Sequence, residues 1–167
     1  MAVVGAAQRP LGLAAAGLLL IACDSGTPGA GTSAAPPAAR ATAAGFDPGP
    51  IKSAAEYLAE PELAAADSAR GELLGLACAA CHKFRAEEGT LIGPHLQGVF
   101  GRPAASVAGF NYSPALRQSG LVWTPKSIEA WLANPAGFVE GTTMAFSGYR
   151  SEQDRRDLVA YLLRVTQ

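Results

Sequence analysis

The chain has 167 residues, 13 of them basic (Lys or Arg) and 14 acidic, so its formal charge at pH 7 is −1. This length predicts one domain. The near-neutral charge excludes the basic surface typical of a nucleic-acid-binding protein, and there is no lysine block to steer a strongly acidic partner. Residues 24–50 are rich in Gly, Pro, Ala, Ser and Thr, which leaves residues 67–167 as the predicted compact domain.

The first 22 residues have the pattern of a signal peptide. Arg9 precedes an apolar run over residues 11–22, which is shorter than the about 20 residues that a membrane span needs and suits a signal-peptide core. The run ends in Leu20-Ile21-Ala22-Cys23, which resembles a bacterial lipoprotein box. That resemblance implies removal of residues 1–22 and lipidation of Cys23. A plain cleaved signal with an incidental Cys23, and an uncleaved short anchor, are the alternatives.

Two segments separate this leader from the domain. Residues 23–50 begin with the lipidated Cys23, and the Pro/Gly/Ala-rich stretch that follows predicts a flexible linker with a reach of roughly 25–30 Å; the alternative is a spacer with no role in reach. Residues 51–66 include Ser53 and Glu56, which form a capping-box pattern. Pro61 limits this helix to two turns, and we expect it to dock on the domain.

The domain, residues 67–167, shows helix signals at several points. Asp67 is a predicted N-cap for a helix with Gly71, Leu74 and Cys78 at helical spacing. Ser113-Pro114 to Gly120 has the start and stop signals of a short helix. Between Lys83 and Asn111 we expect long loops.

Two further helices are predicted in the second half of the domain. Thr124 and Pro125 are expected at the N-cap and first position of one helix, which ends at Asn134-Pro135 and has the buried residues Ile128, Trp131 and Leu132. Ser151 with Asp154 marks the start of the C-terminal helix, whose apolar face is predicted to be Leu158, Tyr161, Leu162 and Val165. The fold class is therefore mostly helical.

The most informative motif is Cys78-Ala79-Ala80-Cys81-His82. A C-x-x-C-H run is the pattern of covalent c-type haem attachment, in which two thiols on one turn bond one porphyrin and the next histidine lies over the iron. A zinc site or a thioredoxin-like redox pair could also use C-x-x-C. However, Cys23 and His95 are the chain's other Cys and His residues, and no βαβ pattern is present.

Met144 is a candidate second ligand for such an iron. It is the one methionine outside the predicted leader and lies in the sequence Glu-Gly-Thr-Thr-Met-Ala-Phe, 62 residues after His82. An exposed methionine in a loop between two predicted helices needs a reason; a role as core filler would be unremarkable, and ligation of the iron is the other interpretation.

From Asp67 to its end, the chain resembles the class I c-type cytochromes, close to the mitochondrial type. The segments that carry the resemblance are C-A-A-C-H, I-G-P-H-L-Q-G-V-F-G-R, F-N-Y-S-P-A-L, L-V-W-T-P, L-A-N-P, G-T-T-M-A-F and D-L-V-A-Y-L. The resemblance implies an all-α class I cytochrome c fold, in which crossed N- and C-terminal helices, short helices and long loops surround one covalent haem c.

The resemblance also implies a role for particular residues. Cys78 and Cys81 would form the thioethers, His82 and Met144 would be the axial ligands of the iron, and the Pro94 carbonyl would accept the other ring N–H of His82. Residues matching the haem pocket and its propionate contacts are Arg102, Tyr112, Trp123 and Trp131. The helix crossing would place Gly71 and Leu74 against Leu158 and Tyr161.

The chain departs from the family pattern at a few positions. His95 stands where Asn is usual, and Gln97 replaces a His. Trp131 replaces the Tyr that bonds the methionine sulfur, and because its N–H lies in a different place the resemblance does not carry that bond over. Glu140 replaces a Pro before the methionine, which predicts a looser loop. The lysine-rich docking face of the family is mostly absent.

The predicted function is one-electron transfer, not enzymatic catalysis. We expect a monomer tethered by lipid on the periplasmic side of the inner membrane, with a soluble periplasmic protein as the alternative. Redox proteins would be its partners: a quinol-oxidising complex or dehydrogenase as donor, a terminal oxidase as acceptor, and no nucleic acid. The alternatives are a permanently bound subunit of a dehydrogenase or oxidase, and a haem protein whose labile methionine loop lets it bind small ligands or reduce peroxide.

Overall fold

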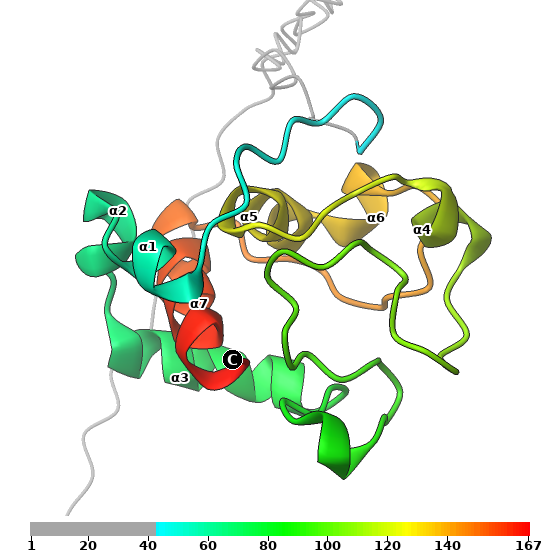
Figure 1. The fold of residues 1–167 in the computed structure, drawn as a ribbon, viewed down its shortest axis with the longest axis horizontal. Helices are drawn as coiled ribbons and strands as arrows, with labels where there is room; N and C mark the ends of the chain where they lie inside the picture. The colour runs from blue at the N-terminus through cyan, green and yellow to red at the C-terminus, as the bar shows by residue number, and fades with distance from the viewer. Residues whose placement is uncertain (1–42) are drawn as a thin grey trace, which may run out of the picture. The chain divides into compact units, whose positions relative to one another are not determined.

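The computed structural model describes residues 43–167 and shows helices joined by long loops (Figure 1). The predicted signal peptide, the lipidation site Cys23 and linker residues up to 42 lie outside this range. In the described range the one β pairing is a bridge between Pro103 and Val122. The elements are α1 (Ala54–Leu58), α2 (Pro61–Ala64), α3 (Ser68–Ala79), the 3-10 turn η1 (Ala86–Glu88), α4 (Pro114–Gln118), α5 (Pro125–Ala133), α6 (Pro135–Phe138) and α7 (Glu152–Val165).

Polar side chains start these helices where the sequence predicted. Each predicted cap accepts a hydrogen bond from a backbone N–H in the first turn, which satisfies a donor that the helix leaves open. These caps are Ser53 for α1, Asp67 for α3, Ser113 for α4, Thr124 for α5 and Ser151 for α7. The prediction of five helix starts is therefore confirmed. Sequence reasoning missed α6, which Asn134 caps through Gly137 N–H.

The helices α3 and α7 cross at close range, as Figure 1 shows on the left of the molecule. A side chain on Gly71 would collide with the backbone of Asp157 and lie 2.8 Å from Tyr161 Cβ, so only glycine permits this approach. Asp157 is 2 % exposed, and its carboxylate accepts a bond from Asp67 N–H at 2.9 Å, which ties the start of α3 to α7. The predicted crossing is confirmed.

The core lies between α7, α5 and the loops. Leu158 and Leu162 of α7 are buried as predicted, whereas the predicted Tyr161 and Val165 are only partly buried. Val159, Ala160 and Leu163, which were not predicted, are buried too. The buried face of α7 is wider than the predicted stripe because α7 also contacts α1, α2 and α5. On α5 the predicted face of Ile128, Trp131 and Leu132 is buried.

The segment before α3 packs on the domain. Tyr57 of α1 and Leu63 of α2 are 4 % and 6 % exposed, and both helices contact α7. The prediction of a docked short helix is confirmed, although Pro61 starts a second helix instead of only ending the first. The predicted flexible linker is wrong over residues 43–50, which hydrogen-bond and pack against α5 and α6.

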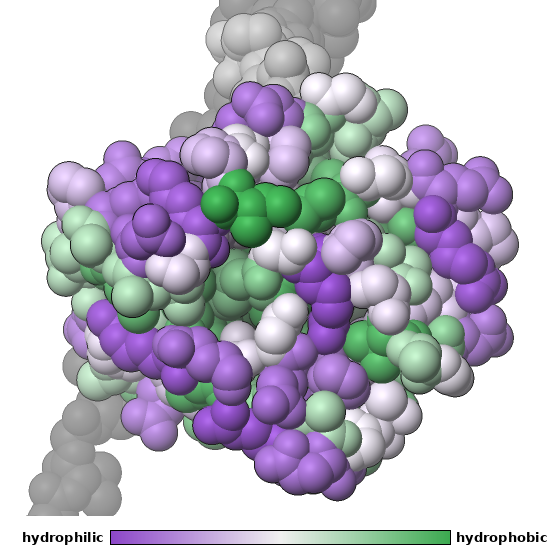
Figure 2. All heavy atoms as spheres, viewed as in Figure 1, coloured by the Kyte–Doolittle hydropathy of each residue, from purple (hydrophilic) through white to green (hydrophobic). Residues whose placement is uncertain are grey.

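Hydrophilic and hydrophobic side chains are interspersed on the face shown in Figure 2. Five large apolar side chains are strongly exposed in the described range: Ile51, Leu73, Leu76, Leu91 and Ile92. Within residues 43–167 no helix has the length and apolar character to cross a bilayer.

Candidate functional site

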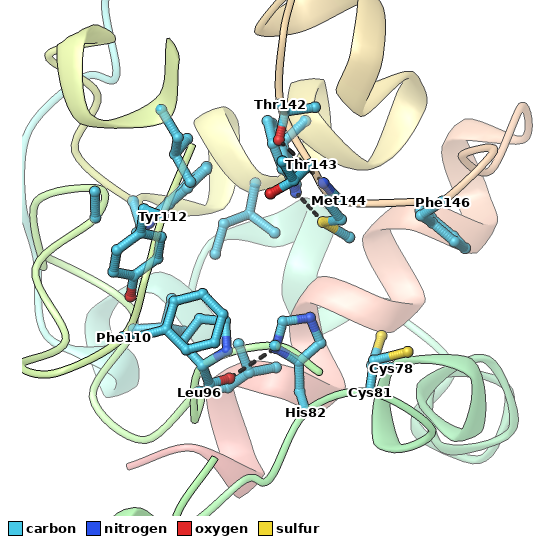
Figure 3. Close-up of a pocket in the computed structure, with 18 of the residues that line it drawn as sticks. Cys78, Cys81, His82, Leu96, Phe110, Tyr112, Thr142, Thr143, Met144 and Phe146 are labelled. Carbon is cyan, nitrogen blue, oxygen red and sulfur yellow. Dashed lines mark hydrogen bonds between the residues drawn. The ribbon is translucent and has the colours of Figure 1, made fainter. Parts of the chain in front are cut away.

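A cavity of about 260 Å³ opens between the end of α3, the loops of residues 80–112, α5 and the loop that follows α6. Most of its lining is apolar, including Leu96, Phe110, Leu116 and Leu132. Figure 3 shows His82 and Met144 extending into the cavity from opposite walls, with Cys78 and Cys81 beside His82. Tyr112 and Phe110 lie on the side away from the cysteines. The cavity thus brings together the cysteines, the histidine and the methionine that the sequence singled out.

The two cysteines lie where α3 ends. Cys78 is in the last turn of α3, and His82 N–H and Cys81 N–H both donate to the Cys78 carbonyl, at 2.8 and 3.0 Å. This tight turn places both thiols along one edge of the cavity. Burial raises the pKa of the Cys78 thiol to about 11, so the thiol stays uncharged at neutral pH. The surroundings of Cys78 therefore suit an uncharged sulfur such as a thioether.

His82 is oriented by its neighbours' backbone. Its Nδ1 lies 2.7 Å from the Pro94 carbonyl oxygen. Because a carbonyl only accepts, Nδ1 carries the proton and Nε2 keeps its lone pair for a metal. Burial lowers the pKa of His82, partly offset by the bond to Pro94, which favours the neutral imidazole that a metal needs.

Gly93 completes the support of His82, and sequence reasoning missed it. A Cβ on Gly93 would overlap the imidazole, lying 2.6 Å from Nδ1 and 2.8 Å from Nε2. Gly93 N–H also donates to the Cys81 carbonyl at 2.8 Å. The Ile-Gly-Pro segment therefore closes over the imidazole ring of His82. The sequence signal for this contact was the glycine directly before Pro94.

Met144 is positioned by side chains. Trp131 Nε1 donates to the Met144 sulfur at 3.2 Å, and Met144 N–H donates to Thr142 Oγ1 at 3.3 Å. The sequence did not predict the first bond, because the indole N–H was expected to lie elsewhere. The Trp131 ring also packs edge-on against Trp123, with centroids 5.5 Å apart. Trp131 and Thr142 thus direct the sulfur into the cavity.

Polar groups occupy the end of the cavity away from the cysteines. Arg102 donates to the carbonyls of Gln97 and His95, at 2.8 and 3.2 Å, and burial lowers its pKa without removing its charge. The Tyr112 hydroxyl accepts from Val107 N–H at 3.3 Å, and burial raises its pKa. A cation and a phenol here suit an acidic substituent on a cavity ligand.

His95 does not line the cavity. Its Nδ1 is buried and has no hydrogen-bond partner among the described residues, and its carbonyl accepts from Arg102. The structure thus places this spare histidine in the loop wall and away from the space between His82 and Met144.

Comparison with known proteins identifies this arrangement. The family model described as cytochrome c matches residues 68–166. The chain belongs to the cytochrome c family. A cytochrome c of Cochliobolus lunatus is 43 % identical over 90 residues, which are 54 % of this chain and 83 % of that protein. A cytochrome c of Arabidopsis thaliana is also 43 % identical over 90 residues, 54 % of this chain and 80 % of the relative.

A solved structure shows the same fold. Cytochrome cH from Methylobacterium extorquens is similar with a TM-score of 0.54 and 40 % sequence identity, covering 57 % of this chain and 96 % of that one. The protein is thus an all-α class I cytochrome c. The family consists of electron-transfer proteins and not enzymes, and its members bind one covalent haem c, for which the C-x-x-C-H motif of this chain has the required spacing.

The cavity fits that cofactor. Its walls are apolar, its two sulfurs lie along one edge, and a nitrogen with a free lone pair faces a thioether sulfur across it. Residues 43–67 precede the family match, so the packed segment with α1 and α2 lies outside the part of the chain that the family model covers.

Proposed function

We propose that Cys78 and Cys81 form the two thioethers and that His82 and Met144 are the axial ligands of a one-electron carrier. The observation that supports this assignment is the opposition of His82 and Met144 across one apolar cavity, each held by a hydrogen bond of its own. The haem, when bound, supplies a one-electron ferric/ferrous couple, and His/Met ligation raises its potential. With His82 and Met144 as its ligands, the metal would have no position open to water or substrate, which suits electron transfer without bond chemistry.

We further assign the remaining pocket residues. The Pro94 carbonyl keeps the His82 proton on Nδ1. Arg102, Tyr112 and Trp123 lie in the cavity wall as candidate partners of a propionate, which would offset the cost of burying a carboxylate. Trp131 donates to the sulfur of Met144. This bond argues against the labile-loop alternative, in which an open iron binds small ligands or reduces peroxide.

The surface chemistry supports a transient redox partner that is not strongly acidic. The exposed residues that line the cavity are all uncharged: Ala77, Ile92, Pro103, Thr143 and Ala145. Ile92 is 81 % exposed. Each of the chain's three lysines lies within 4.0 Å of a carboxylate, in the pairs Lys52–Glu60, Lys83–Glu88 and Lys126–Asp47. Docking through such a neutral, apolar rim would depend little on long-range steering.

A membrane tether would keep the protein close to its redox partners. This would raise the rate of encounter, which weak electrostatic steering leaves low. We propose that Cys23 is lipidated and that the protein works on the periplasmic side of the inner membrane, between a quinol-oxidising complex or a dehydrogenase and a terminal oxidase. The support is the sequence of residues 1–23. A permanently bound subunit would have the same chemistry with a fixed partner.

The ferric visible spectrum of the protein matured with haem-attachment machinery tests the ligand assignment. We expect the far-red charge-transfer band of iron–methionine sulfur, and Met144→Ala should abolish it while Thr143→Ala, one residue away and exposed, should keep it. A Met144→Ala protein that retained the band would overturn the assignment of Met144.

The tether is tested by Cys23→Ser. We expect the wild-type protein to partition with membranes at high salt and the variant to be released, because each acyl methylene contributes about 0.8 kcal/mol to anchoring. Release of both proteins would point to a soluble carrier. Retention of both at high salt would point to a bound subunit or to an uncleaved anchor at residues 1–22.

A further inference from the structure

The segment of residues 43–50, which precedes the family match, contacts the short helix at the base of the Met144 loop. Ala43 N–H donates to the Phe138 carbonyl at 2.8 Å. The Phe46 ring packs edge-on against the Phe138 ring, with centroids 5.1 Å apart and an interplanar angle of 88°. Phe138 ends α6 and is 4 % exposed. The segment therefore covers the residue from which the Met144 loop departs.

The same segment is also fixed to α5, the helix that carries Trp131. Thr124, the N-cap of α5, is 1 % exposed and donates through Oγ1 to the Pro48 carbonyl at 2.7 Å. The Lys126 ammonium lies 5.5 Å from the centre of the Phe46 ring. These contacts fix the segment to both elements that position Met144, because α6 leads into its loop and α5 supplies the indole donor to its sulfur.

A chain of short contacts connects Phe138 to Met144. Val139, the next residue, is 5 % exposed, and its carbonyl accepts from Thr142 N–H at 3.1 Å. Thr142 Oγ1 in turn accepts from Met144 N–H at 3.3 Å. Between them Glu140 is exposed and Gly141 has a positive φ of 86°, so this turn has little burial of its own. Its position depends on the anchored residues at its base.

We propose that residues 43–50 are a clamp that positions Met144: by holding Phe138 and the start of α5, they keep the methionine on the metal. This inference rests on the proposed role of Met144 as an axial ligand. It gives residues 43–50 a function in the site, beyond joining the domain to the leader. Phe46 is the positioning residue, since its ring makes the aromatic contact with the base of the loop.

The experiment compares Phe46→Ala with Leu63→Ala in the full-length ferric holoprotein. Both positions precede the family match, but Leu63 lies on α2, which packs on α7. The probe is imidazole, which binds the iron only when Met144 leaves. Its apparent affinity therefore rises in proportion to the open fraction.

We expect Phe46→Ala to tighten apparent imidazole binding by roughly threefold to tenfold, the equilibrium factor that corresponds to loss of one aromatic pair. Phe46→Leu, which keeps most of the apolar volume, should give a smaller increase. Leu63→Ala should lower resistance to denaturant and leave imidazole binding unchanged.

Three results would overturn the clamp, and they are distinguishable. If the parent protein shows the iron–methionine band and all three variants bind imidazole as the parent does, the clamp is wrong while the ligand assignment stands. If the parent lacks that band, Met144 is not the ligand and the clamp is wrong with it. An equal increase for Leu63→Ala and Phe46→Ala would show a general loosening and would also overturn the specific role of Phe46.

Discussion

His82 and Met144 lie on opposite walls of one cavity and are held there by different means. His82 follows directly on the cysteine turn, and its ring is fixed by the backbone: the Pro94 carbonyl on Nδ1 and the close approach of Gly93. Met144 lies in a turn between helices and depends on side chains, chiefly the Trp131 indole and the Thr142 hydroxyl. We call the surroundings of His82 the histidine wall and those of Met144 the methionine wall. Substitution of a side chain in the histidine wall should therefore change the position of His82 little, except at Gly93. In the methionine wall, a single side chain can change how firmly Met144 is held.

The largest expected effect is on the histidine wall. Gly93→Ala places a Cβ 2.6 Å from His82 Nδ1, so either the imidazole or the backbone must move. We expect a loss of stability of roughly 1–3 kcal/mol, typical of overpacking, together with loss of the native low-spin spectrum in part of the holoprotein. Denaturant unfolding and visible spectroscopy measure the two effects.

Gly98→Ala is the matched control for this substitution. Gly98 has a positive φ of 63° and open space around its Cβ position, so alanine there costs about 1–2 kcal/mol of backbone strain without touching His82. The spectrum should stay native in this variant. A native spectrum and undiminished stability in Gly93→Ala would show that the backbone does not restrain the histidine.

A smaller effect is expected on the methionine wall from Trp131→Phe. The indole N–H points the positive end of its dipole at the sulfur and therefore favours the ferrous state, in which the iron carries less positive charge. Removal of this N–H should lower the reduction potential. A hydrogen bond contributes roughly 0.5–1.5 kcal/mol, which limits the fall to about 60 mV for one electron. Potentiometric titration measures it.

Trp131→Tyr distinguishes the effect of losing the hydrogen-bond donor from the effect of losing ring volume. Both variants remove part of a ring that is 6 % exposed and packs on Trp123, but tyrosine retains a donor. The potential of Trp131→Tyr should lie closer to that of the parent. Equal potentials in parent and Trp131→Phe would mean that the 3.2 Å contact has no electrostatic effect on the iron.

The difference between local signals and contacts of distant segments explains what the sequence could predict. Caps and spacing are local signals, so the starts of α3, α5 and α7 were predicted from them. The His82 contact with Pro94, 12 residues away, was predicted only through the resemblance to the class I c-type cytochromes. Asn134-Pro135 was interpreted as a helix end, but Asn caps and Pro starts helices equally well, and α6 was missed. The two-turn limit at Pro61 likewise hid α2.

Long-range contacts were beyond this reasoning. Residues 43–50 have the Gly and Pro content of a linker, and nothing local shows that Thr124, 76 residues after Pro48, donates a hydrogen bond to the Pro48 carbonyl. The Trp131 contact with the sulfur depends on where α5 sits relative to the Met144 loop, and this is decided by packing. Side chains from distant segments hold Met144, so the methionine wall was less predictable than the histidine wall. The same dependence on side chains makes the position of Met144 easier to change by substitution.

The smallest expected effect comes from Thr142→Val, which is nearly isosteric but removes the hydroxyl that accepts Met144 N–H at 3.3 Å. The Thr142 N–H bond to the Val139 carbonyl is a backbone bond and should survive. We expect a loss of about 0.5 kcal/mol, seen as a rise of about twofold in the apparent imidazole affinity of the ferric holoprotein. Thr142→Ser keeps the hydroxyl and should behave as the parent. If valine and serine variants bind imidazole alike, the hydroxyl does not hold the loop, and Trp131 with the clamp at Phe138 is sufficient to keep Met144 in place.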